Sequence, residues 1–202
     1  MQNGKESSIM NETISVLMKR RSIRKYLPDQ INDDDLTTIL QTGLYAPSGG
    51  DHQYTRFFVI QDTQRLYEIS SIVRQEFAKL DIIEGQYQNK TIIKAKQQEN
   101  YNFMYEAPTL IVAVAPKTHG NSMADSANGL ENMQIAATAL GLGACWVNQL
   151  HWLTGNEVLR SYFEPLGLSE DEDIFGSIVI GYPALPLHQP TSRKEGRIVI
   201  VK

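Results

Sequence analysis

Apolar residues recur at helical spacing along much of the chain and predict five helices. Asn11 and Asp62 are typical N-cap residues, and acidic residues after Asn32 suit the first turn of a helix. The strongest pattern runs from Asp125 to about Leu140, where two glycines follow. The predicted helices cover about 11–20, 33–46, 62–80, 125–140 and 155–162.

Continuous apolar runs between these helices predict short strands. Pro108 precedes the strongest run, and Gly181-Tyr182-Pro183 closes another. The runs that we interpret as strands are Arg56–Ile60, Thr109–Ala115, Ala144–Val147, Ile174–Ile180 and Ile198–Val201. A few strands among many helices indicate an α+β or α/β fold.

Three stretches have little regular pattern. Residues 1–12 are mostly polar, so we expect a flexible N-terminus followed by a single domain over 13–202. Residues 86–105 are polar with weak helical periodicity, and suit a surface helix pair or a segment that covers a site. Residues 184–190 carry prolines that exclude regular sheet or helix.

Composition narrows the classes of function. The chain is 42% hydrophobic and 21% charged, with a net charge of −4 and a pI near 5.6, which argues against nucleic acid as the main partner. One cysteine excludes an intrachain disulfide framework and a multi-cysteine metal site. No apolar run reaches the roughly 18 residues of a membrane span, and no signal peptide is visible, so we expect a cytoplasmic protein without a membrane partner.

A cationic cluster stands out against this acidic background. Five of the seven residues from Lys19 to Lys25 are Lys or Arg, and none is acidic. Guanidinium groups suit a phosphate or another oxyanion, although a solvated helix end or a nucleic-acid patch has the same composition. Further on, the turn Ala46–Gln53 can bring backbone N–H groups close to a planar polar ligand.

Familiar catalytic motifs are missing. Gly141–Trp146 lacks the third glycine of a dinucleotide fingerprint and follows a helix instead of opening one. The four histidines are dispersed, and no zinc-protease, serine-hydrolase or Walker A pattern occurs, so we expect no metal. No motif pairs Cys145 with a base, which favours a buried, inert thiol. Chemistry carried by a cofactor fits such a chain.

Four segments in order resemble the nitroreductase family of FMN-dependent oxidoreductases. They are Arg20–Tyr26, Ala46–Gln53, Glu131–Trp146 and the basic Thr191–Lys194, and the resemblance runs from about Thr13 to the end. It implies an α+β fold with a central, mostly antiparallel sheet of four or five strands flanked by helices. It also implies a homodimer in which the C-terminal extension reaches the partner subunit.

The resemblance also assigns cofactor-binding residues. Arg20, Ser22 and Arg24 would contact the FMN ring, ribityl chain or phosphate, with Arg21 a more structural candidate. The flavin of the other subunit would be approached by Pro47, Ser48 and Gly49. Gln53 and Asp51 are further cofactor-binding candidates of this turn. Asp51 replaces the usual Asn and cannot donate a hydrogen bond when it is ionised. The backbone of Gly143, Cys145 and Trp146 would pass the isoalloxazine ring, and Arg193 and Lys194 would reach the phosphate.

The implied activity is an NAD(P)H-dependent FMN oxidoreductase. A hydride would pass from NAD(P)H through flavin N5 to an acceptor such as a nitroaromatic or a quinone, by a ping-pong mechanism. No catalytic side chain is expected beside the flavin. The alternatives are a non-catalytic flavin-binding module, or a family branch that catalyses dehydrogenation or dehalogenation.

Overall fold

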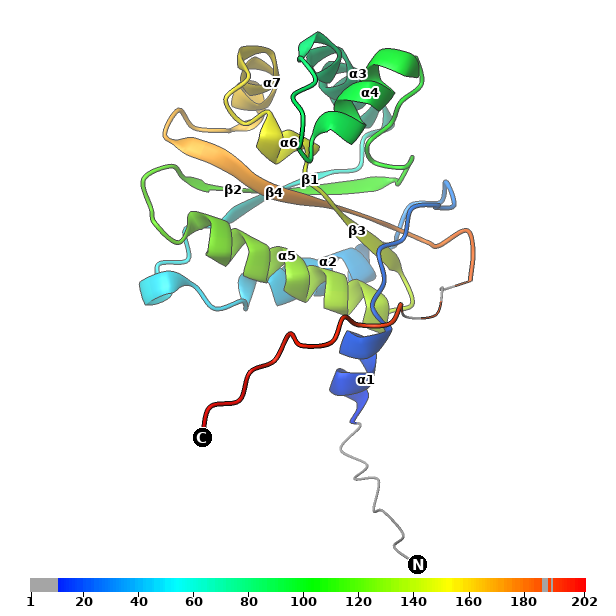
Figure 1. Ribbon diagram of the computed structural model, residues 1–202, viewed down its shortest axis with the longest axis vertical. Helices are drawn as coiled ribbons and strands as arrows, with labels where there is room; N and C mark the ends of the chain where they lie inside the picture. Colours follow the sequence, from blue (N-terminus) through cyan, green and yellow to red (C-terminus); the bar gives the residue numbers. More distant parts are fainter. Residues whose placement is uncertain (1–10, 187–188, 190) are drawn as a thin grey trace, which may run out of the picture.

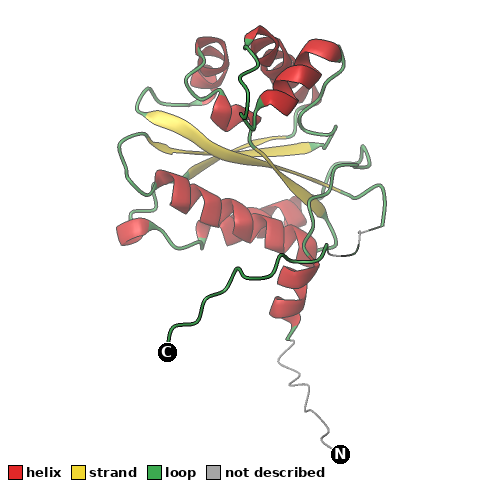
Figure 2. Cartoon of the chain, in the orientation of Figure 1, coloured by secondary structure: helices red, strands yellow, loops and turns green. Residues whose placement is uncertain are grey.

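A four-stranded antiparallel sheet with helices on both faces forms the centre of the molecule (Figure 1). The computed structural model describes residues 11–186, 189 and 191–202. Helices α3, α4, α6 and α7 cover one face of the sheet, and α2 and α5 cover the other (Figure 2). The expected α+β class and the antiparallel sheet are confirmed.

The sheet has the strand order β1-β2-β4-β3, and every neighbouring pair is antiparallel. Every residue of β2 except the last is buried, because helices cover both faces. The bounds are β1 Arg56–Ile60, β2 Thr109–Pro116, β3 Gly143–Val147 and β4 Glu172–Gly181. Four of the predicted strands therefore form close to their expected positions.

The fifth predicted strand, Ile198–Val201, does not form. These residues have no strand assignment, and their side chains are 74–91% exposed. A strand needs a neighbour for its backbone hydrogen bonds, and this segment runs outside the body of the molecule (Figure 1). The prediction is wrong for the isolated chain.

The helices begin where the predicted caps lie. Asn11, Asn32 and Asp62 each accept a hydrogen bond from the N–H group three residues on. The helices are α1 Glu12–Lys19, α2 Asp33–Leu44, α3 Thr63–Lys79, α4 Asn89–Gln97, α5 Ser122–Ala139, α6 Gln149–Trp152 and α7 Glu157–Phe163; Gly49–Asp51 (η1) and Glu164–Leu166 (η2) are 3₁₀ turns. Helix α5 starts three residues before the expected Asp125, and the short α6 was not predicted from the sequence.

Close packing of α2 on α5 depends on small residues. A Cβ on Gly43 would lie 2.1 Å from the terminal methyl of Met133. A Cβ on Gly129 would lie 2.7 Å from Phe57 and 3.3 Å from the carbonyl oxygen of Gly43. The two glycines therefore let the helix backbones approach, and Ile39, Leu130 and Met133 fill the core between them and the sheet.

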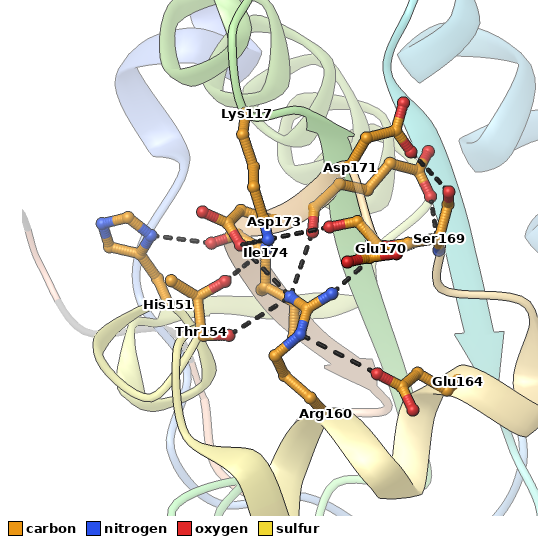
Figure 3. Close-up of polar contacts among 11 residues, drawn as sticks. Lys117, His151, Thr154, Arg160, Glu164, Ser169, Glu170, Asp171, Asp173 and Ile174 are labelled. Atoms are coloured by element: carbon orange, nitrogen blue, oxygen red, sulfur yellow. Dashed lines mark hydrogen bonds and ion pairs between the residues drawn. The ribbon is translucent and has the colours of Figure 1, made fainter.

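Arg160 of α7 ties the other helical layer to the start of β4 (Figure 3). Its guanidinium donates to the carbonyls of Glu172 and Ser169 at 3.1 Å, and it contacts the Asp173 carboxylate at 3.2 Å. The side chain is only 14% exposed. These contacts of Arg160 fix the segment 164–173, which leads into β4. Strand β4 begins at Glu172, two residues before the expected Ile174.

The polar 86–105 stretch contains one helix, α4, between turns. Its Ile92 and Ala95 are buried in the core that α4 shares with α3. No helix among the described residues is long and apolar enough to cross a membrane.

Candidate functional site

The cationic 20–26 segment lies against the edge strand of the sheet. The Ile23 N–H donates to the Ala144 carbonyl at 3.0 Å, and Ser22 forms a parallel bridge with Ala144. A Cβ on Gly143 would lie 2.9 Å from Ile23, so this contact requires glycine. Two of the predicted motifs, Arg20–Tyr26 and Glu131–Trp146, are thus joined by backbone pairing.

A cavity of about 440 Å³ opens beside this junction. The 20–26 segment, the end of β3, the start of α6 and the cavity-facing side of α4 enclose it. Its lining combines cationic, aromatic and amide groups: Arg24, Tyr87, Lys90, Thr91, Ile93, Lys94, Tyr101, Tyr105, Trp146, Val147, Asn148, Gln149 and Trp152. Arg24 and Trp146 are the members that the sequence had singled out as cofactor-binding candidates.

The side chain of Gln149 has an unused hydrogen-bonding end. Its amide nitrogen donates to the Tyr101 hydroxyl at 3.2 Å and to the Thr91 hydroxyl at 3.4 Å. Its Oε1 atom is buried, yet it has no partner among the described residues. A buried polar atom without a partner is costly, so this end of the amide suits a polar edge of a ligand. Burial raises the pKa of Tyr101, which keeps its hydroxyl protonated as part of this network.

Tyr105 forms part of the cavity wall near Arg24. The Arg24 guanidinium carbon lies 5.8 Å from the ring centroid of Tyr105, within reach of a cation–π contact. Tyr105 and Glu106 have φ of 58° and 59°, in the left-handed region that side chains rarely adopt. Such backbone strain often accompanies a functional site.

Cys145 lies beneath this wall as a buried thiol. Burial raises its pKa, although Arg24 and Ser22 act in the opposite direction. The thiol is 1% exposed, and it donates weakly to the Trp146 carbonyl. It is therefore held protonated and out of contact with solvent, as expected for an inert cysteine.

The other cationic residues of the segment point to different partners. Arg20 forms an ion pair with Glu131 of α5 at 3.4 Å. Arg21 donates to the carbonyl of Met18 at 2.8 Å and to that of Arg20, so it holds its own segment. Ser22 and Arg24 also line a second hollow of about 360 Å³, together with Ile23, Lys25, Leu185 and Pro186.

The predicted turn at 47–53 lies elsewhere in the chain, at the N-terminal end of α5. The Gly49 N–H donates to both carboxylate oxygens of Asp125 at 3.1 and 3.2 Å, and Asn128 donates to the Pro47 carbonyl. Gln53 donates to Ser48 through its backbone and to Asp51 through its amide. These residues do not line the 440 Å³ cavity.

The strained geometry of this turn is unusual. Asp51 and Gln53 have φ of 54° and 52°, and Gly50, just before Asp51, has φ of 63°. Arg193 and Lys194 do not line the cavity either: they lie in the exposed C-terminal tail, where the Arg193 guanidinium donates to the carbonyl and hydroxyl of Thr191. Within one chain, the predicted candidates therefore form three separate groups.

Several lining residues escaped the sequence analysis. Asn148 and Gln149 line the cavity, although no motif in the sequence marks them as ligand-binding residues. Tyr87, Lys90, Thr91 and Lys94 follow the i, i+3, i+4, i+7 spacing of one helical face, a signal hidden by the polarity of the whole segment. No group of three or more His, Cys, Asp or Glu residues that could hold a metal occurs in the described part of the chain.

The fold is that of a known class of protein. A family model described as the nitroreductase family matches residues 17–182. The chain belongs to the nitroreductase family.

Individual relatives agree with this membership. A nitroreductase with bound FMN from Bacteroides fragilis is 34% identical, with a TM-score of 0.87 over 96% of this chain and 100% of that one. An NADPH-flavin oxidoreductase of Vibrio harveyi is 26% identical over 86% of this chain and 67% of its own length. A Desulfitobacterium hafniense nitroreductase, at 22% identity, has the same fold with a TM-score of 0.82 over 96% of this chain and all of that one.

Proposed function

We propose that this protein is an FMN-dependent NAD(P)H oxidoreductase. The observation that supports this proposal best is a cavity lined by Arg24 and several aromatic rings, in which the buried Oε1 atom of Gln149 has no hydrogen-bond partner among the described residues. The fold around this cavity is shared with an FMN-bound nitroreductase. A flavin offers a phosphate, a planar ring and an N–H edge, which need a cation, an aromatic wall and an acceptor. The residues present fit this group.

The cationic segment would hold the phosphate end. Arg24 and Ser22 lie on one short stretch that backbone pairing fixes to β3, so both groups are positioned before a ligand binds. Arg20 would assist from the same stretch once its pairing with Glu131 is exchanged for a closer anion. Gly143, Cys145 and Trp146 would contribute the wall along the ring through backbone and side-chain contacts.

FMN, when bound, supplies two-electron chemistry between NAD(P)H and an acceptor. NAD(P)H gives up a hydride and becomes NAD(P)⁺, and a quinone that gains this hydride and a proton from solvent becomes a hydroquinone. The side chains of the cavity bind and orient these partners and exclude water. Cys145 contributes no nucleophile, because burial keeps its thiol protonated.

The turn at 47–53 and the basic pair Arg193 and Lys194 would complete the site across a homodimer. The strained 47–53 turn and the extended tail with Arg193 and Lys194 are outside the cavity of their own chain. In a two-fold dimer the same segments of the partner subunit can approach it. A protein of this kind with a single buried cysteine suits the reducing cytoplasm, our proposed location.

Steady-state kinetics test this function. Donor and acceptor would share one cavity and bind alternately, so NADPH or NADH oxidation at several fixed concentrations of a quinone should give parallel double-reciprocal lines. Intersecting lines would show a ternary complex and contradict the shared cavity. Absence of any oxidation by flavin-loaded protein would leave a flavin-binding module instead of an enzyme.

A further inference from the structure

The cavity carries more positive charge than its cationic segment supplies. Lys90 and Lys94 of α4 join Arg24 among its lining residues, and no Asp or Glu is found among the described residues that line it. Neither lysine has an ion-pair or hydrogen-bond partner among the described residues, whereas Arg20, Arg56 and Arg160 all have carboxylate partners. The two ammonium groups are therefore available to a ligand.

The geometry of α4 directs these lysines to the cavity. Ile92 and Ala95, 1% and 2% exposed, bury the opposite face of the helix in the core. Residues four positions apart share a helix face, so Lys90 and Lys94 form one stripe along the cavity. The stripe belongs to α4, an element distinct from the 20–26 segment that we assign to the FMN phosphate.

The rest of the lining is aromatic. Trp152 of α6 lies beside Tyr87, with ring centroids 5.8 Å apart, and Trp146 and Tyr101 line the same space. Aromatic walls favour planar rings, and lysines without partners favour an anion. A ligand that uses both features is a planar aromatic molecule bearing a carboxylate or a sulfonate.

We propose that Lys90 and Lys94 select anionic aromatic compounds as electron acceptors. The inference rests on the proposed function, because it names the class of acceptor for the same cavity. It also assigns α4 as the element that sets acceptor preference. Both lysines are exposed, so their effect is a screened electrostatic attraction of modest size that weakens as salt is added.

The test compares two probes that differ mainly in charge, 4-nitrobenzoate and 4-nitrobenzamide. Binding to the flavin-loaded protein is measured by titration calorimetry, which needs no turnover, and kcat/KM is measured in parallel. The decisive quantity is the affinity for the benzoate relative to the benzamide. We expect this ratio to fall about threefold in Lys90→Ala and in Lys94→Ala, and about tenfold in the double variant.

Lys96→Ala is the matched control, because Lys96 lies on the same helix, is exposed and does not line the cavity. It should leave the ratio unchanged. The double variant K90E/K94E should invert the preference toward the benzamide. In the wild type, added NaCl should weaken benzoate binding and leave benzamide binding unaltered.

Three results would overturn the proposal. An unchanged ratio in the double variant would remove the lysines from acceptor selection. Equal losses of affinity for both probes, together with a weaker affinity for FMN, would show that the lysines bind the cofactor. A raised KM for NADPH but not for NADH would show that they bind the extra phosphate of the donor. A charge-selective binding ratio without NAD(P)H oxidation would instead show that the lysines select anionic aromatic ligands and would reject the proposed enzyme activity.

Discussion

Individual side chains of the cationic cluster have different surroundings. Arg24 faces the cavity, whereas Arg21 is turned onto the carbonyls of Met18 and Arg20. Composition alone cannot make this distinction, because both residues lie in the same seven-residue run. The family resemblance assigns Arg24 to the phosphate and Arg21 a structural part, and the phosphate contact of Arg24 stays a prediction.

Arg24→Ala should weaken FMN binding by about 1.5–3 kcal/mol, the usual range for a hydrogen bond to a charged group. Arg21→Ala should have a smaller effect, because its guanidinium already serves its own segment. Fluorescence titration of apoprotein with FMN gives both dissociation constants. The reverse order of effects would show that the phosphate lies elsewhere.

Cys145→Ala should retain most of its turnover per bound flavin. The thiol is 1% exposed, and burial raises its pKa, so at neutral pH it is neither a thiolate nor accessible. The comparison uses NAD(P)H oxidation normalised to flavin absorbance. An inactive variant with full flavin content would reveal covalent chemistry at this position.

Helices and strands with strong local patterns were predictable. Asn11, Asn32 and Asp62 act as caps as expected, and four apolar runs form the four strands. These elements depend on short-range periodicity, which a single sequence displays. The expected strand at Ile198–Val201 fails because a strand also needs a neighbour, which the local sequence does not supply.

The cavity was less predictable than the elements around it. Its wall combines Arg24, α4 and residues 146–149, which are far apart in sequence. The free end of the Gln149 amide depends on contacts with Thr91 and Tyr101 that no motif encodes. Sequence analysis proposed cofactor motifs but could not identify which polar residues of the 86–105 stretch line the cavity.

The attachment of α7 to β4 depends on Arg160. Arg160→Ala should lower the free energy of unfolding by about 2–4 kcal/mol, because the part-buried Glu172 carbonyl loses its guanidinium donor and Asp173 loses the closer of its two cationic partners. Arg160→Lys should cost less, since it keeps the charge but not the planar fork. Urea denaturation followed by circular dichroism measures both. Wild-type stability in Arg160→Ala would contradict the claim that Arg160 attaches α7 to β4.

Glu172 at the start of β4 should make stability depend on acidity. Hydrogen bonds from Arg56, at 2.8 and 2.6 Å, hold the pKa of this carboxyl below its ordinary 4.5. A lowered pKa in the folded state stabilises the protein above pH 4.5, and this contribution is lost as the pH falls further. Glu172→Gln should flatten the fall in unfolding free energy below about pH 4.5, and the exposed Glu170→Gln should not. An unaltered pH profile in Glu172→Gln would contradict the ion pair.

The whole molecule has segments that suggest a partner subunit. The C-terminal tail leaves the body of the chain and exposes Ile198–Val201, and the strained 47–53 turn does not line its own cavity (Figure 1). We expect a homodimer with twice the 22.8 kDa mass of one chain. Light scattering after size exclusion measures this mass, and deletion of residues 184–202 should shift it toward the monomer and lower flavin content. A flavin-bound monomer would contradict the two-chain site.

Flavin content is the most direct measure of the central claim. The protein purified without added cofactor should be yellow, and heat denaturation should release one non-covalent flavin per chain that co-elutes with FMN rather than FAD. Cavity chemistry predicts this result, because Arg24, the aromatic wall and the free end of Gln149 match the phosphate, ring and N–H edge of FMN. Protein that is colourless as purified and stays colourless after incubation with FMN would contradict it.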